Sequence, residues 1–158
     1  MNASILLTIA GIDVVEGDNG QLSYVAGMQI DDDGSGDPHH DPDFQARTSY
    51  RNGGNWLNAD LVPYIVLPPR VIRAVPGIVL GCQAQVTNIL TGLVSPAVVG
   101  DVGPMDRLGE GSIALARAIG VDPSPTTGGE DRPIIRYLLF PGVAAVVNGI
   151  TYQLQSLE

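Results

Sequence analysis

The chain has 158 residues, enough for one domain with a sizeable core, and its hydrophobic fraction of 44% argues against wholesale disorder. Its 8 basic residues, all arginines, face 17 acidic residues, and the net charge of −9 makes nucleic acid an unfavourable partner. The single cysteine, Cys82, excludes an internal disulfide and a cysteine metal cluster. Such acidity attracts cationic polymers or metal ions, although it also serves solubility alone.

The first half of the chain alternates short apolar runs with polar loops. Residues 4–9 and 22–30 are expected to form strands, and two loops follow at 31–43 and 47–58. The apolar stretch 4–12 is too short to cross a bilayer. It also lacks the basic residues and the cleavage site of an export signal. We therefore expect no membrane partner and recognise no signal peptide.

The second half contains further strand signals and one convincing helix. The helix is predicted over residues 113–119, with Ser112 as its N-cap and Gly120 as its stop. Asn148-Gly149 is the strongest hairpin signal in the chain. The expected strands cover residues 62–67, 78–89, 94–99, 134–140, 143–147 and 150–154.

This order of elements predicts a mainly β protein. We expect one catalytic domain over residues 1–158, built as a small closed β-barrel with long loops on one side and one short α-helix. The sequence shows no internal repeat and no linker that would divide the chain.

Two carboxylates near the predicted helix are the best candidates for chemistry. Asp101 ends a buried strand, where loss of solvent raises the pKa of a carboxylic acid toward that of a general acid. Glu110 lies between Gly109 and Gly111, just before the helix N-terminus, whose dipole favours an ionised group. Two such carboxyls are what glycoside hydrolysis requires. Alternatively, Asp101 caps a turn and Glu110 is an ordinary first-turn acid of the helix.

The segment that holds both carboxylates resembles a known enzyme family. Residues 101–121, DVGPMDRLGEGSIALARAIGV, are similar to the core motif of the family 75 chitosanases, in which an Asp ends a strand and Gly-Glu-(Gly/Ala)-Ser-Ile opens a helix. Supporting matches occur, in the family's order, at residues 30–34 (IDDDG), 45–49 (QARTS), 57–60, 63–67 (PYIVL) and 137–142 (YLLFPG). The resemblance implies that Asp101 and Glu110 are catalytic and that the chain is an inverting endo-chitosanase. It leaves open which of the two is the acid.

The same segment resembles, more distantly, double-psi β-barrel proteins of the rare lipoprotein A and expansin kind. That likeness implies a six-stranded double-psi-like barrel with the active Asp on a groove across it. The family resemblance also implies an extracellular enzyme, and we expect it to act as a monomer without cofactor. The loop between Asp101 and Glu110 is shorter than in the family, which bears on the separation of the two carboxyls.

A chitosan substrate gives the acidic loop a role. Chitosan carries an ammonium group on each deacetylated sugar, and carboxylates along a cleft pair with such groups. We expect this partner to be bound by Asp31, Asp33, Trp56, Tyr50 and Asp106, the aromatic residues by stacking on sugar rings. No metal is predicted, because the aspartates do not match the EF-hand pattern, although a looser calcium site, or zinc at His39-His40, stays open.

Three other functions remain as alternatives. A peptidoglycan-active barrel enzyme would use Asp101 alone as acid and base by turns. An expansin-like module would bind a polysaccharide without cleaving it, and a scaffold or phage-tail role is a residual choice. Glu110→Gln separates the first alternative from the chitosanase, because Glu110 is dispensable there.

Overall fold

The computed structural model of the protein describes residues 4–36, 41–51 and 54–155. Its elements follow the chain in the order β1 (Ser4–Ile9), β2 (Ile12–Glu16), β3 (Leu22–Asp31), β4 (Tyr64–Leu67), α1 (Pro69–Ile72), β5 (Cys82–Asn88), β6 (Val94–Val102), β7 (Glu110–Ser112), α2 (Ile113–Ala118), β8 (Glu130–Ala144), β9 (Val146–Val147) and β10 (Ile150–Thr151). No helix among the described residues is both long enough and apolar enough to cross a membrane.

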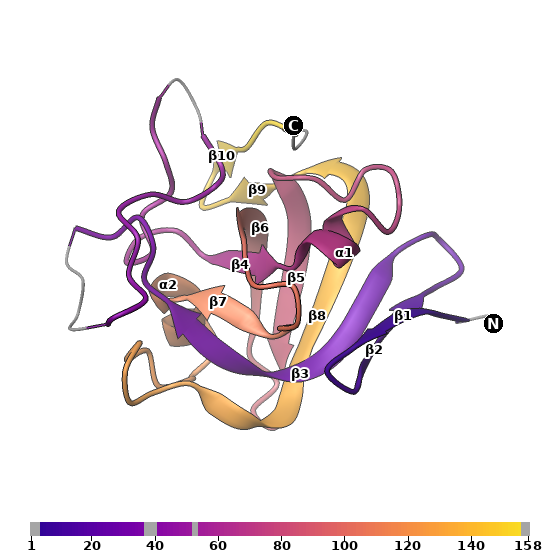
Figure 1. The fold of residues 1–158 in the computed structure, drawn as a ribbon, viewed down its shortest axis with the longest axis horizontal. Coiled ribbons are helices and arrows are strands. Elements are labelled where there is room, and N and C mark those ends of the chain that lie inside the picture. The colour runs from indigo at the N-terminus through magenta and orange to yellow at the C-terminus, as the bar shows by residue number, and fades with distance from the viewer. Residues whose placement is uncertain (1–3, 37–40, 52–53, 156–158) are drawn as a thin grey trace.

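Six of these strands close into a barrel (Figure 1). They neighbour one another in the order β3-β7-β4-β6-β5-β8, and β8 returns to pair with β3. Two neighbouring pairs, β3 with β7 and β4 with β6, are parallel, and β4 runs antiparallel to β7. The closed six-stranded barrel expected from the sequence is therefore confirmed. Closure leaves these strands without a free edge.

The interior of the barrel is filled by alternate residues of its strands. Along β3, the residues Leu22, Tyr24, Ala26, Met28 and Ile30 are buried, as strand periodicity requires when one face packs in a core. The Tyr24 ring stacks on Tyr137 of β8, with the centroids 4.7 Å apart. Residues at odd positions, such as Gln29, therefore face outward.

The predicted helix is confirmed as α2, and Ser112 joins it to the barrel. Ser112 Oγ accepts hydrogen bonds from the N–H groups of Leu115 and Tyr64 and donates one to the carbonyl of Val62. This side chain is fully buried. It therefore caps the helix and also fixes the start of β4.

Two strand predictions need correction. β8 is one strand of 15 residues, and a bulge between its pairs with Cys82 and Gln83 accommodates the Pro141-Gly142 signal that predicted a break. β5 begins only at Cys82, because a turn through Gly81, whose φ is +90°, precedes it. The structure also contains a second short helix that the sequence did not predict, α1, which begins at Pro69 just after β4.

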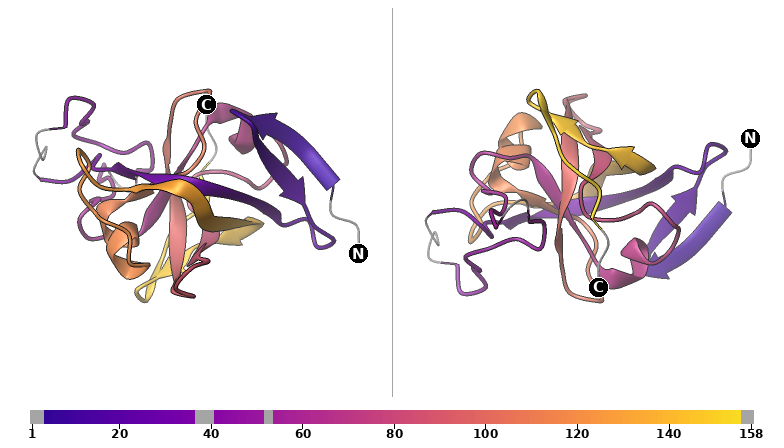
Figure 2. Two further views of the ribbon diagram at one scale, coloured as in Figure 1. Left: turned by 90° about the horizontal axis from the view of Figure 1, so that it is seen from below. Right: turned by 90° about the horizontal axis from the view of Figure 1, so that it is seen from above.

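The N-terminal strands form a hairpin outside the barrel. β1 pairs with β2 in antiparallel register, and Ala10 and Gly11, both with positive φ, make the tight turn between them. Figure 1 and both views of Figure 2 show this hairpin projecting from the side of the barrel opposite the loops that follow β3. The sequence predicted β1 but not β2. The Asn148-Gly149 hairpin between β9 and β10 is present as predicted.

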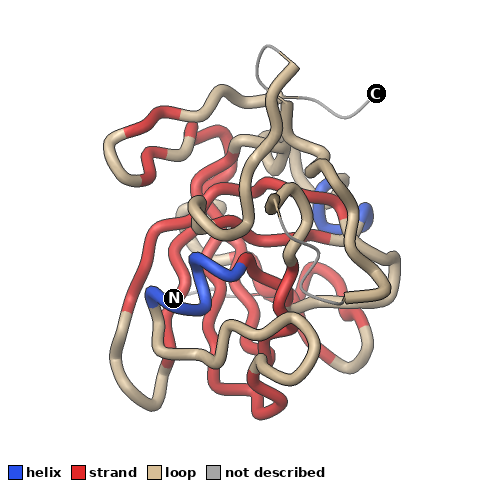
Figure 3. Tube along the Cα trace, turned by 90° about the vertical axis from the view of Figure 1, so that its left-hand side faces the viewer, coloured by secondary structure: helices blue, strands red, loops and turns tan. Residues whose placement is uncertain are grey.

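The long loops lie together on one side of the barrel, as expected. The segment between β3 and β4 occupies the left-hand side of Figure 1, and Figure 3 views the molecule from that side. These loops and the outer face of β3, β7, β4 and β6 enclose the site described next.

Candidate active site

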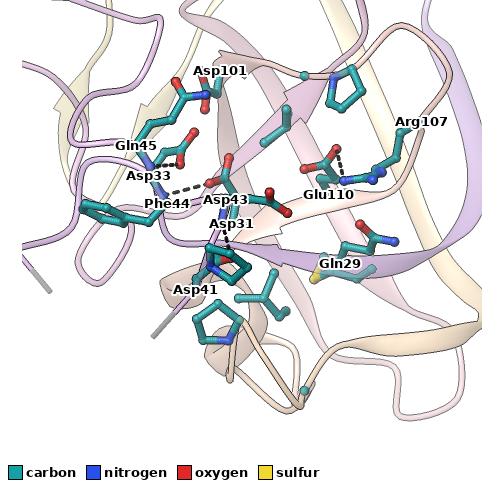
Figure 4. A pocket seen from close by; sticks show the side chains of 18 of the residues that line it. Gln29, Asp31, Asp33, Asp41, Asp43, Phe44, Gln45, Asp101, Arg107 and Glu110 are labelled. Atoms are coloured by element: carbon teal, nitrogen blue, oxygen red, sulfur yellow. Dashed lines mark hydrogen bonds and ion pairs between the residues drawn. The ribbon is translucent and has the colours of Figure 1, made fainter. Parts of the chain in front are cut away.

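An acidic cleft of about 810 Å³ lies against the outer face of the barrel. Strands β3, β4, β6 and β7 supply its floor, and the loop at 41–45 supplies one wall (Figure 4). Its described lining includes seven carboxylates: Asp31, Asp33, Asp41, Asp43, Asp101, Glu110 and Asp131. Such a concave, negatively charged surface focuses the field on a cationic ligand.

One lateral row of residues crosses the floor of this cleft. Gln29 of β3 pairs with Glu110 of β7, Glu110 pairs with Val66 of β4, and Val66 pairs with Asp101 of β6. Laterally paired residues point to the same face of a sheet, so both carboxylates point into the cleft. Because adjacent strands are about 4.8 Å apart, the backbones of Asp101 and Glu110 are separated by roughly 10 Å.

Asp101 is held by three hydrogen bonds on one oxygen. Its Oδ1 accepts from Ser49 N at 2.9 Å, from Ser49 Oγ at 2.8 Å and from Val102 N at 3.0 Å. Donors placed in this way stabilise negative charge on the carboxylate. The sequence reasoning missed Ser49, although it lies in the QARTS segment that carries part of the family resemblance.

Glu110 occupies a drier environment. Its Oε1 is buried and accepts no hydrogen bond, and the nearest charge is Arg107 Nη1, at 3.8 Å. Burial raises the pKa of Glu110 to about 7; Arg107 opposes this effect, and Asp101 adds to it. Gly103 lies close by, since a Cβ there would come within 3.2 Å of Oε1.

The helix-dipole prediction for Glu110 is therefore wrong. Glu110 is part of strand β7, the helix begins only at Ile113, and its first turn contains no acidic residue. Burial rather than a dipole decides the protonation of Glu110. Glu110, expected to be the ionised partner, is thus the carboxyl whose pKa is raised, and burial is the main cause.

Asp31 and Asp33 join Asp101 in a tight cluster. One carboxylate oxygen from each of the three lies within 4.8 Å of the others. Burial, followed by the neighbouring charge of Asp101, raises the pKa of Asp31. Burial and a hydrogen bond with Asp101 raise the pKa of Asp33. Asp31 and Asp33 therefore retain protons at pH values where isolated carboxyls would be charged.

Backbone contacts hold this cluster in place. Asp31 Oδ1 accepts from Asp33 N at 2.8 Å, and Asp33 Oδ1 accepts from Gln45 N at 2.9 Å. The buried Tyr64 of β4 donates its hydroxyl to the Asp33 carbonyl at 2.9 Å. The three carboxylates are also the donors that a hard divalent cation prefers, so the absence of a metal stays a prediction.

The other predicted ligands lie outside the described lining of the cleft. Tyr50 is 1% exposed, packs edge-on against Tyr152 and accepts a hydrogen bond from Gln153 N, so it is a core residue and the sugar-stacking prediction is corrected. Asp106 is exposed on the loop between β6 and β7. His39 and His40 fall outside the described residues.

Trp56 keeps an exposed ring. It is 40% exposed, and the Arg47 guanidinium lies 5.2 Å from its ring centroid. Arg47 also lines a smaller hollow of about 350 Å³, which shares Gln45 with the main cleft. Trp56 is thus next to a residue of the smaller hollow and is not among the described residues that line the main cleft.

Comparison with known proteins assigns this architecture to a family. The family model described as fungal chitosanase of glycosyl hydrolase group 75 matches residues 28–156. The match includes the whole acidic loop, both carboxylates and most of the barrel, and leaves out the hairpin of β1 and β2. The chain has no match among curated proteins.

Proposed function

We propose, from the premise that this chain belongs to the fungal chitosanase family of glycosyl hydrolase group 75, that it cleaves β-1,4 bonds within chitosan by inversion. Family membership makes the chain a chitosanase-like glycosidase with a polysaccharide substrate. The proposal adds the residues and the mechanism: Glu110 is the general acid and Asp101 is the general base. We also propose that the enzyme acts outside the cell, where it would encounter polymeric chitosan.

One observation carries the assignment of roles. The two carboxylates sit on strands that flank β4, on the same face, in opposite environments. The buried Glu110, with its pKa near 7, still holds a proton around neutrality and can give it away. Three donors fix Oδ1 of Asp101, so its other oxygen is held in place to accept a proton from water.

The geometry supports inversion rather than retention. Inverting glycosidases hold the two carboxyls about 6.5–9.5 Å apart, so that a water molecule fits between the base and the sugar. Retaining enzymes need only about 5–5.5 Å. Backbones roughly 10 Å apart, across the intervening strand β4, suit the wider spacing.

The reaction then proceeds in one displacement. Glu110 donates its proton to the glycosidic oxygen as the bond from that oxygen to the anomeric carbon breaks. A water molecule attacks the anomeric carbon from the opposite face and loses a proton to Asp101. Both carboxyls return to their starting states when Asp101 releases its proton and Glu110 takes one up from solvent.

Asp31 and Asp33 are the proposed contacts for a substrate ammonium. They lie within 4.8 Å of Asp101, on the cleft floor, so a deacetylated sugar beside the scissile bond would place its ammonium among them. A neutral acetylated sugar cannot replace the protons of the cluster with a charge of its own. The cluster therefore favours deacetylated chains.

The test uses soluble, highly deacetylated chitosan and follows viscosity together with new reducing ends. We expect a rapid fall in viscosity with few reducing ends, lost in Glu110→Gln and in Asp101→Asn. Glu16→Gln, on β2 and outside the cleft, is the matched control and should remain active. Full activity in Glu110→Gln would overturn the two-carboxylate mechanism, and combined with inactive Asp101→Asn it would point to a lone-Asp enzyme.

A further inference from the structure

One basic side chain lies among the carboxylates of the cleft lining that the structure describes. The described lining residues include seven carboxylates and one arginine, Arg107. The chain contains no lysine. A guanidinium repels the ammonium groups of chitosan, so substrate binding does not explain its presence. Its position requires a different reason.

Arg107 is directed at the proposed acid. It precedes Glu110 by three residues on the loop between β6 and β7, and its Nη1 lies 3.8 Å from Glu110 Oε1 (Figure 4). Gly109, with φ +92°, makes the turn that allows this approach, and a side chain there would collide with the Gly27 carbonyl. The Arg107 side chain is 43% exposed and that of Glu110 only 11%, so the cation approaches from the open side of the cleft.

The groups around Glu110 act against one another. Burial, Asp101 of β6 and Asp43 of the acidic loop raise its pKa, and Arg107 lowers it. From within the barrel, the buried hydroxyls of Tyr24 (β3) and Tyr137 (β8) lie near enough for Glu110 to disfavour their ionisation. These tyrosines stay neutral. Among the described groups, Arg107 is therefore the one charged group that lowers the pKa of Glu110.

We propose that Arg107 is a positioning residue for Glu110, holding its carboxyl toward the cleft and setting the pH range over which it carries the catalytic proton. This inference rests on the proposed function, because it takes Glu110 as the acid. Without the cation, burial and neighbouring acids would leave Glu110 too weak an acid to protonate the leaving oxygen efficiently. Arg107 also stabilises the charge that appears on Glu110 as its proton departs.

The test compares Arg107→Gln, Arg107→Lys and the matched control Arg136→Gln, an exposed arginine of β8 outside the cleft lining. In Arg107→Gln, the alkaline limb of kcat/KM against pH should move upward by up to about one pH unit, with a lower kcat at the optimum. Arg107→Lys should restore the limb, and Arg136→Gln should leave it in place. An unmoved limb in Arg107→Gln would overturn the proposal.

A second readout needs no substrate. The chain contains four glutamates, so selective ¹³C labelling of their side-chain carboxyls gives a short spectrum in which Glu110→Gln identifies the Glu110 signal. Its titration midpoint should rise in Arg107→Gln and return in Arg107→Lys. If Glu110→Gln stays active, the proposed function fails. Glu110→Gln can instead be inactive while Arg107→Gln changes neither the alkaline limb of kcat/KM nor the titration midpoint of Glu110. In that case only the role proposed for Arg107 is wrong.

Discussion

Ser49 donates two hydrogen bonds to the same oxygen of Asp101, one from its backbone N–H at 2.9 Å and one from its hydroxyl at 2.8 Å. The two residues are 52 positions apart, and the contact joins the loop after β3 to the end of β6. A carboxylate held in this way cannot rotate, so its second oxygen keeps a fixed direction. Ser49 therefore positions the proposed base.

Replacing Ser49 by alanine should slow the reaction without unfolding the protein. The backbone bond remains, but the lost hydroxyl bond to a charged group is worth about 1.5–3 kcal/mol, which corresponds to roughly tenfold or more in kcat. Steady-state kinetics on chitosan measures this effect, with Ser23→Ala, on β3 and outside the cleft, as the control. An unchanged kcat in Ser49→Ala would show that Asp101 needs no such support.

The products should appear first as the α-anomer. Asp101 and Glu110 are both lateral partners of Val66, on either side of β4, and this separation leaves room for a water molecule. Inversion at a β-linked sugar gives an α-anomeric hydroxyl, which ¹H NMR detects before mutarotation. Initial formation of the β-anomer would instead require a covalent intermediate and would contradict the proposed mechanism.

Local sequence patterns predicted which elements form the barrel better than they predicted where its strands begin and end. The Ser112 cap and the Asn148-Gly149 turn are specified by adjacent residues, and both are present. The length of β8 depends on its pairing with β3 along one half and with β5 along the other, which a single strand's pattern does not reveal. Because β8 pairs with both neighbours to close the barrel, it continues through Pro141 and Gly142, which separate the strands predicted at 134–140 and 143–147.

In the candidate active site, too, the sequence predicted what adjacent residues determine and missed what distant residues determine. The motif and family resemblance located both carboxylates, but their environments depend on distant partners. Ser49, 52 positions away in the sequence, donates hydrogen bonds to Asp101. Glu110 is buried in the short strand β7, at a place where the sequence indicated a helix N-terminus. Tyr50 looked like a loop aromatic because its packing partner Tyr152 is about a hundred residues further along the chain.

Folding stability should fall as the pH rises from mildly acidic values through neutrality. Glu110 has a folded pKa of about 7, above its ordinary value of 4.5, and burial raises the pKa of Asp31 and of Asp33 as well. Groups with raised pKa bind protons more tightly when folded, so they favour folding at low pH and oppose it once they must ionise. The decline should be seen in chemical denaturation between about pH 5 and pH 8.

Glu110→Gln isolates one part of that decline. The amide cannot ionise, so the variant should exceed the wild type in stability above neutral pH, by as much as ~3 kcal/mol, and match it in acid. Glu130→Gln, at a half-buried position paired with Arg132, is the comparison and should bring no such gain. A Glu110→Gln protein that lost stability at every pH would show that the carboxyl is not held neutral by burial.

Chitosan binding should release protons from the enzyme. Asp31 and Asp33, which lie beside Asp101, retain protons in the empty cleft because burial and the charge of Asp101 raise their pKa. An incoming ammonium supplies the missing positive charge, so those protons leave as it binds. Calorimetry of the inactive Glu110→Gln variant with chitosan oligomers, in slightly acidic buffers of different ionisation enthalpy, measures the number released.

The released proton should depend on Asp31 in particular. Asp31→Asn in the Glu110→Gln background removes one titrating member of the cluster but retains an acceptor for the Asp33 backbone N–H. Its observed binding heat should vary less between buffers, and its affinity for a deacetylated oligomer should fall by more than its affinity for an acetylated one. Glu16→Gln in the same background should change neither quantity. Equal heats in all buffers for the unmodified cluster would mean that the ammonium binds elsewhere in the cleft, and the role assigned to Asp31 and Asp33 would be wrong.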